Sequence, residues 1–252
     1  EPESNLRIGG AVALVDRQGH PRVRRSDLVR CKHADRIVGA EAQQRVIEYR
    51  PGAVAQAELA GPPLRMIAGS RVLVVGLGAI GRAAAARFHV LGARVSGIRR
   101  RIGGPPPPGV EQVAPPEELL PLLPHADIVV LAAPQTSETR RLIGRRELAA
   151  MRRGALLVNV GRGALVDEAA LAEALEAADP HGIAAAALDV FEEEPLPRDS
   201  PLWGLPNVLI TPHVAGFRPA HWDAVGAVFA ENLRRFEEGQ PLLHVVDKRA
   251  GY

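Results

Sequence analysis

The chain has 252 residues, of which 46% are hydrophobic and 24% charged, an ordinary balance for a globular protein with a core of its own. Its formal net charge is +2, and arginine supplies almost all of the positive charge, since only Lys32 and Lys248 are lysines. No basic tail or set of stacking aromatics indicates nucleic-acid binding. No 18-residue apolar run or signal peptide is apparent, and Cys31 is the single cysteine, so we expect no membrane span, no internal disulfide and a cytoplasmic location.

The first 70 residues carry few recognisable signals. Ala11–Val15 has the apolar, β-branched character of a strand. The range 33–50 has helical composition and ends before Pro51, which predicts a long helix followed by a linker over 51–70.

A glycine-rich stretch follows a strand-like run. Val72–Val75 is short, apolar and β-branched, as a buried parallel strand is. Gly76, Gly78 and Gly81 then form G-x-G-x-x-G, in which the glycines allow a tight turn, close approach to a pyrophosphate and packing of the next helix. A chance spacing in a chain with 25 glycines is the alternative.

The residues after this turn predict a helix and a second strand. Ile80, Ala84, Phe88 and Leu91 fall at helical spacing. Gly92 stands where a left-handed cap belongs, and the strand is expected over 94–98.

Arg99, Arg100 and Arg101 stand at the end of that second strand. A dinucleotide-binding unit that prefers NAD carries a carboxylate there for the ribose 2′-hydroxyl, whereas arginine accommodates a 2′-phosphate. The cluster therefore predicts NADP, and a solvated loop in an arginine-rich chain is the alternative.

The remaining elements alternate between strands and helices. Strands are predicted at 127–132, 155–160, 183–190 and 208–211, and helices at 116–123, 142–151 and 167–178. This alternation predicts an α/β fold with a doubly wound parallel sheet, in which ligands bind beyond the carboxyl ends of the strands.

Four polar residues follow separate strands and suit chemistry on a keto acid. His213 is a proton donor with an ordinary pKa of about 6.5, and Glu194 can fix its tautomer. Arg162 offers a planar fork to a carboxylate, between glycines that let substrate approach the backbone. Asp189 can accept from the nicotinamide carboxamide. A surface histidine, a solvated acidic loop and a helix-capping arginine are the alternatives.

Four segments, in this order, resemble the D-isomer-specific 2-hydroxyacid dehydrogenases. They are VVGLGAIGR (74–82), NVGRGALVDE (159–168), LDVFEEEPLP (188–197) and TPHVAG (211–216). The resemblance implies that Arg162 binds the substrate carboxylate, that Glu194 pairs with His213, and that His213 is the acid/base. It also implies cofactor contacts, beside Gly76 and Gly81 of the turn, at Leu77, Gly78, Ala79, Ile80, Ala133, Pro134, Val160, Gly161, Asp189 and Gly216.

The chain departs from this family in two places. NAD-using members carry aspartate at the position of Arg99, and basic residues there resemble the NADP-using glyoxylate and hydroxypyruvate reductases. Family members also place a complete substrate domain before the long helix. Residues 1–32 are too few for that domain, so we expect an incomplete one at 1–32, the dinucleotide-binding domain at 33–217 and a returning C-terminal helix and tail at 218–252.

These observations predict an NADP-dependent reductase of a small 2-keto acid, with glyoxylate or hydroxypyruvate as substrate and without a metal. NAD is the less favoured cofactor. A homodimer through the helix over 33–50 is implied by the resemblance. The alternative is a catalytically weak nucleotide-binding module with a regulatory or assembly role.

Overall fold

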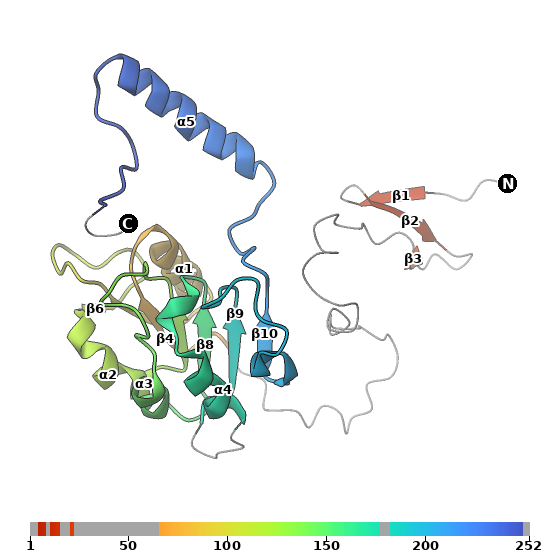
Figure 1. Ribbon diagram of the computed structural model, residues 1–252, viewed down its shortest axis with the longest axis vertical. Helices are drawn as coiled ribbons and strands as arrows, with labels where there is room; N and C mark the ends of the chain where they lie inside the picture. The colour runs from red at the N-terminus through yellow and green to blue at the C-terminus, as the bar shows by residue number, and fades with distance from the viewer. Residues whose placement is uncertain (1–4, 9–10, 16–20, 23–65, 177–181, 249–252) are drawn as a thin grey trace. The chain divides into compact units, whose positions relative to one another are not determined.

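The structure is a computed structural model that describes residues 5–8, 11–15, 21–22, 66–176 and 182–248 (Figure 1). The chain divides into two compact units, Glu1–Pro51 and Gly52–Tyr252. The predicted helix over 33–50 and most of the predicted linker over 51–70 lie outside the described residues.

The described part of the first unit is a small antiparallel sheet. Its strands β1 (Asn5–Ile8), β2 (Ala11–Val15) and β3 (Pro21–Arg22) pair in the order β1-β2-β3. The strand predicted over 11–15 is confirmed with the same bounds.

The second unit is built on a seven-stranded parallel sheet with the order β10-β9-β8-β7-β4-β5-β6 (Figure 1). The chain runs from β4 outward to β6, then returns to β7 beside β4 and continues outward to β10. The predicted α/β doubly wound sheet is therefore confirmed, with its switch point between β4 and β7. The strands are β4 (Arg71–Val75), β5 (Arg94–Ile98), β6 (Gln112–Ala114), β7 (Ile128–Leu131), β8 (Leu156–Asn159), β9 (Ala185–Leu188) and β10 (Val208–Ile210).

Five α-helices and several 3₁₀ turns are described in this unit. The α-helices are α1 (Ala79–Val90), α2 (Leu119–Leu122), α3 (Arg145–Ala150), α4 (Glu168–Glu176) and α5 (His221–Glu237), and the 3₁₀ turns are η4 (Pro116–Glu118), η5 (Leu123–His125), η6 (Gly163–Leu165) and η7 (Pro201–Gly204). No helix in the described ranges combines the length and apolarity needed to cross a bilayer.

Helix α3 is shorter than the predicted range 142–151. Its start is delayed because Ile143 forms an isolated parallel bridge with Val166. The Ile143 amide donates to the Leu165 carbonyl, and the Ile143 carbonyl accepts from the Asp167 amide. A residue whose backbone groups are bound to another segment cannot enter the helical ladder, so the helix begins after Gly144.

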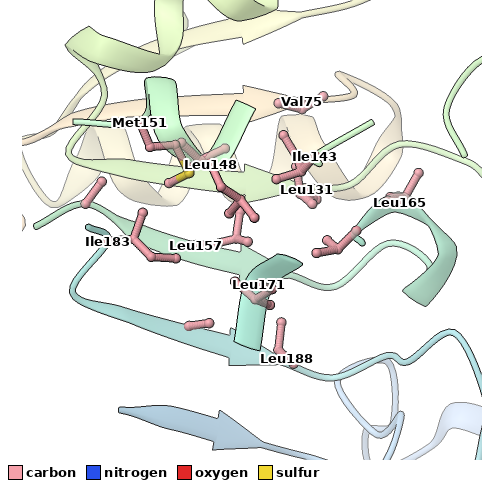
Figure 2. Packing of buried hydrophobic residues seen from close by; sticks show 14 of the residues in the cluster. Val75, Leu131, Ile143, Leu148, Met151, Leu157, Leu165, Leu171, Ile183 and Leu188 are labelled. Carbon is pink, nitrogen blue, oxygen red and sulfur yellow. The ribbon is translucent and has the colours of Figure 1, made fainter. Parts of the chain in front are cut away.

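Two apolar cores lie on opposite faces of the sheet. Alternate residues of the central strands face opposite ways, so Val75 and Leu131 belong to one core while Val74 and Val130 belong to the other. Figure 2 shows the first core, where Leu148 of α3 and Leu171 of α4 meet the strand residues. Complete burial of such a side chain contributes about 1.5–3 kcal/mol. These cores fix the strand ends from which the functional loops emerge.

The helix predicted after the glycine turn is confirmed as α1, and of the four residues that predicted it only Ala84 and Phe88 are partly buried. Ile80 is 60% exposed and Leu91 is 53% exposed, and the buried residues of this helix are Gly81 and Ala85. The helix meets the sheet through these small residues, because a Cβ atom on Gly81 would lie 1.9 Å from the Gly76 carbonyl oxygen. Close approach of the backbones therefore decides which face is buried. The predicted cap is confirmed, since Gly92 has φ +85°.

Candidate active site

The turn between β4 and α1 is held by backbone proximity. Gly76 has φ +97°, and a Cβ atom there would lie 2.6 Å from the Ala133 amide nitrogen, so the loop after β7 packs directly on the turn. By contrast, a Cβ atom on Gly78 would meet no protein atom within 4 Å. Protein packing thus explains Gly76 and Gly81, and the space beside Gly78 is open to a ligand.

The candidate cofactor residues gather at one edge of the sheet. Gly76, Leu77, Gly78, Ala79, Ile80 and Gly81 follow β4, Arg99, Arg100 and Arg101 follow β5, Ala133 and Pro134 follow β7, Val160 and Gly161 follow β8, Asp189 follows β9, and Gly216 lies beyond β10. Because these strands are parallel, their carboxyl ends share this edge. One residue of the set faces inward, since Leu77 is buried and packs over Gly97.

The arginines after β5 differ in their contacts. One Arg99 nitrogen donates to the Gly103 carbonyl at 2.5 Å, while its Nε is buried without a hydrogen-bond partner in the described part of the chain. Arg100 lies 3.5 Å from the Glu138 carboxylate, which joins the loop after β5 to the loop after β7. Arg99 therefore presents the more constrained guanidinium at this strand end.

Arg162, Glu194 and His213 line one open pocket of about 400 Å³. His213 Nδ1 lies 2.8 Å from Glu194 Oε2, so the carboxylate holds the ring through one nitrogen and leaves Nε2 for a substrate. The remaining lining residues are Gln135, Arg140, Gly163, Ala164, Phe191 and Glu192. The structure thus brings together the three residues predicted for the chemistry, from the loops after β8, β9 and β10.

The loop that carries Arg162 is fixed by Asn159, a buried residue that the sequence analysis did not single out. The Asn159 side chain accepts from the Gly161 amide at 3.1 Å and donates to the Arg162 carbonyl at 3.0 Å. Asparagine bonded to the backbone two residues on is a known turn former, and that signal was available in the sequence. One Arg162 nitrogen donates to the Gly161 carbonyl at 2.7 Å.

The expectation that the glycines beside Arg162 make room for substrate is wrong. A Cβ atom on Gly163 would lie 1.7 Å from the Phe191 carbonyl carbon, and one on Gly161 would lie 3.0 Å from the Ala133 carbonyl oxygen. Protein backbone fills the space beside both residues. Gly161 and Gly163 allow neighbouring loops to pack against the turn that carries Arg162.

Asp189 fixes the loop that carries His213. Its carboxylate accepts from the Thr211 hydroxyl at 2.6 Å and from the amides of Val214 and Ala215 at 2.9 and 3.0 Å. Burial favours the protonated acid, but these three donors outweigh it, so the pKa of Asp189 lies below its ordinary value. The carboxylate therefore organises the protein as well as standing at the predicted nicotinamide position.

His213 adopts a left-handed backbone conformation with φ +53°. A non-glycine residue there carries a local cost of about 1–3 kcal/mol and persists only where its surroundings enforce it. The His213 amide donates to the Asp189 carbonyl at 2.7 Å, and Asp189 holds the next two amides. These bonds direct the imidazole toward Glu194.

These features define a class of protein, an α/β domain with a dinucleotide turn and a histidine–carboxylate pair at the same sheet edge. Residues 32–215 match the model of the "D-isomer specific 2-hydroxyacid dehydrogenase, NAD binding domain". The chain belongs to the D-isomer-specific 2-hydroxyacid dehydrogenase family, and the family predicted from the sequence motifs is confirmed.

Relatives with known names and structures agree with this assignment. The chain is 39% identical to the D-3-phosphoglycerate dehydrogenase of Methanocaldococcus jannaschii, over 71% of this chain and 33% of that protein. It is 41% identical to the glyoxylate reductase of Korarchaeum cryptofilum, over 66% of this chain and 49% of that protein. The chain thus spans between a third and a half of the length of these curated relatives.

A solved structure gives a broader match. The D-isomer-specific 2-hydroxyacid dehydrogenase of Xanthobacter autotrophicus Py2, in complex with NADPH and MES, is 43% identical and superposes with a TM-score of 0.69. The match covers 79% of this chain and 80% of that chain. The dehydrogenase family therefore shares both the sequence motifs and the sheet described above.

Proposed function

We propose that the protein uses NADPH to reduce a small 2-keto acid, either glyoxylate to glycolate or hydroxypyruvate to D-glycerate, the D-2-hydroxy acid. The observation that carries this proposal is the His213–Glu194 pair at 2.8 Å in the pocket that Arg162 also lines. A proton donor and a carboxylate-binding guanidinium in one pocket suit a substrate with adjacent carbonyl and carboxylate groups.

Each catalytic residue has a separate task in this proposal. Arg162 pairs with the substrate carboxylate, since within the described ranges one of its nitrogens is bonded to its own turn and its other donors meet no protein acceptor. His213 gives the proton to the carbonyl oxygen as the keto carbon is reduced. Glu194 orients the imidazole and stabilises the imidazolium before the proton is transferred.

The residues of the β4–α1 turn fit a dinucleotide. The space beside Gly78 is open, and α1 begins without a side-chain cap or an acidic residue in its first turn, so its first amides can meet a pyrophosphate. When bound, a reduced nicotinamide supplies the hydride for the keto carbon. Asp189 and Gly216 lie on the loops that would border the nicotinamide, beside the pocket of His213.

We assign the preference for NADPH to the arginines after β5. Arg99 is the strongest candidate because its Nε is buried without a partner among the described residues, and a 2′-phosphate oxygen would satisfy it. Arg101 is exposed at the same loop and adds positive charge. The Xanthobacter relative, solved with NADPH, supports the same choice.

The experiment that tests the function is turnover across a small panel of substrates. The purified chain is assayed for oxidation of NADPH and NADH with glyoxylate, hydroxypyruvate, pyruvate and 3-phosphohydroxypyruvate. We expect glyoxylate or hydroxypyruvate with NADPH to give the largest kcat/KM. Tight NADPH binding without turnover of any of the four acids would instead support a nucleotide-binding module.

A further inference from the structure

The loop between β9 and η7, named the acidic loop below, carries Glu194 at the end of a run of three glutamates. Glu192, Glu193 and Glu194 follow Phe191 directly. The Phe191 amide donates to Glu194 Oε1 at 3.0 Å, while Glu194 Oε2 faces His213. One carboxylate therefore serves both its own loop and the imidazole, and its position depends on how the loop is held.

Glu168, at the start of α4, reaches this loop across 24 residues of sequence. Its Oε1 accepts the backbone N–H of Glu192. Capping of α4 is already provided by its neighbour, since Asp167 Oδ1 accepts the Ala170 amide at 3.1 Å. The Glu168 carboxylate is thus directed to the acidic loop instead of the first turn of its own helix.

Other contacts complete the attachment of the loop. The Glu192 carboxylate lies 2.6 Å from Arg140 and 3.7 Å from Arg141. The loop also packs on the turn that carries Arg162, where only a glycine at position 163 leaves room for the Phe191 backbone. Of the described side chains outside the loop, Glu168 is the one that binds the backbone of Glu192.

The environment of Glu168 is unfavourable for a carboxylate. Burial raises its pKa, the Glu192 amide opposes that effect, and the charges of Glu192 and Glu194 raise the pKa further. The ionised Glu168 side chain is therefore less stable in the native state than an exposed glutamate would be. Residues that lower stability in this way are common where function requires a particular contact.

We infer that Glu168 is a positioning residue that holds the acidic loop so that Glu194 meets His213. This inference rests on the proposed function of the same site. Glu168 touches no substrate in this scheme, and it acts on proton transfer only through the Glu192 amide and the loop. The side-chain oxygen of glutamine can accept the same N–H, whereas alanine cannot.

The test compares Glu168→Ala and Glu168→Gln with a matched control on the same helix, Glu173→Ala. Glu173 pairs with Arg145 at the surface and has no described contact with the acidic loop. We expect Glu168→Ala to lower kcat with glyoxylate and NADPH about tenfold, the effect of one hydrogen bond of about 1.4 kcal/mol. KM and the dissociation constant for NADPH should change less than about twofold, because Arg162 and the β4–α1 turn are untouched.

Two further readouts separate positioning from a purely structural role. The loss in Glu168→Ala should fall on kcat and leave KM for glyoxylate near the parent value, because Arg162 still binds the carboxylate. Glu168→Gln should restore kcat to within about twofold of the parent, since one hydrogen bond is retained. If Glu168→Ala does not fold, Glu168→Leu keeps the half-buried stem without an acceptor and is expected to give the same losses.

The NMR signals of the His213 ring read the same contact without turnover. They should move away from their parent positions in Glu168→Ala and stay near them in Glu168→Gln and Glu173→Ala. Parent-like kcat and parent-like His213 signals in Glu168→Ala, or equal losses in Glu168→Gln or Glu173→Ala, would overturn the positioning role. A parent whose His213 signals respond to Glu168→Ala in this way without reducing any keto acid would contradict the proposed function and leave the positioning role standing.

Discussion

The turn between β4 and α1 and the pocket around His213 lie at the same edge of one sheet but are constructed differently. The turn depends on glycine backbone that must approach Ala133 and the start of α1 closely. The pocket depends on side chains from three loops, held by the buried residues Asn159 and Asp189. The turn is thus encoded within nine residues, 74–82, whereas the pocket is a network of residues far apart in the chain.

Because of this difference, the turn and the pocket should respond differently to substitution. Substitutions in the turn are expected to act on NADPH affinity or on folding, through steric contact. Substitutions of the polar side chains that line the pocket are expected to act on turnover, through charge and hydrogen bonding. Substitutions of Gly163 and Asp189, which hold the pocket's loops, are expected to act on stability. Four experiments probe the contrast, in order of decreasing expected effect.

Replacement of His213 by glutamine should have the largest effect of the four, and this effect should be confined to catalysis in the pocket. Glutamine keeps polarity but cannot donate a proton as an acid, so kcat should fall by at least about 10²-fold. The dissociation constant for NADPH should stay near the parent value in a fluorescence titration. Turnover equal to that of the parent would remove His213 from the chemistry.

Gly163→Ala should destabilise the contact between the turn that carries Arg162 and the acidic loop. The new Cβ atom would overlap the Phe191 backbone, and overpacking of this kind costs roughly 3 kcal/mol when backbone must move. Urea unfolding measures the loss of stability. Gly204→Ala is the control, since a Cβ atom there meets nothing within 4 Å; equal midpoints for the two variants would contradict the packing described here.

Asp189→Asn should lower stability in a pH-dependent way. The native pKa of Asp189 lies below its ordinary value of 3.8, so its stabilisation is present above that value and is lost as the pH falls through the native pKa. Asparagine cannot accept from all three donors, and we expect a loss of about 1–2 kcal/mol at pH 7. Chemical unfolding should show this gap narrowing toward pH 3, whereas a gap independent of pH would refute the assignment.

Arg99→Asp should have the smallest effect, confined to the cofactor end. A carboxylate repels a 2′-phosphate and accepts from a 2′-hydroxyl, so the preference for NADPH over NADH should fall about tenfold. Added salt should reduce the parent preference because the contact is partly exposed. An NADPH preference unchanged by the substitution would mean that Arg99 lies in a solvated loop without a role in cofactor choice.

The sequence predicted the local features well because their causes are local. Runs such as Val72–Val75 are apolar throughout because the sheet is covered on both faces, and the glycine spacing encodes the turn directly. The loops after β8, β9 and β10 follow from the parallel order of the strands, so Arg162, Glu194 and His213 could be placed near one another in advance.

The features that sequence could not supply depend on residues far apart in the chain. Asp189 meets Thr211 and Ala215 across 22 and 26 residues, and Gly163 is required by the backbone of Phe191. No periodicity records such pairs. The side of α1 that meets the sheet has a related cause, since close approach to the turn selects Gly81 while Ile80 stays exposed.

The configuration of the product shows in one assay whether the pocket of Arg162 and His213 reduces keto acids as proposed. The chain is incubated with hydroxypyruvate and NADPH, and the glycerate formed is resolved by chiral chromatography. The family is named for its specificity for D-isomers. A reductase of this family that holds the carboxylate on Arg162 and donates the proton from His213 should therefore yield D-glycerate alone. Formation of L-glycerate, a racemic product or no glycerate would contradict the account.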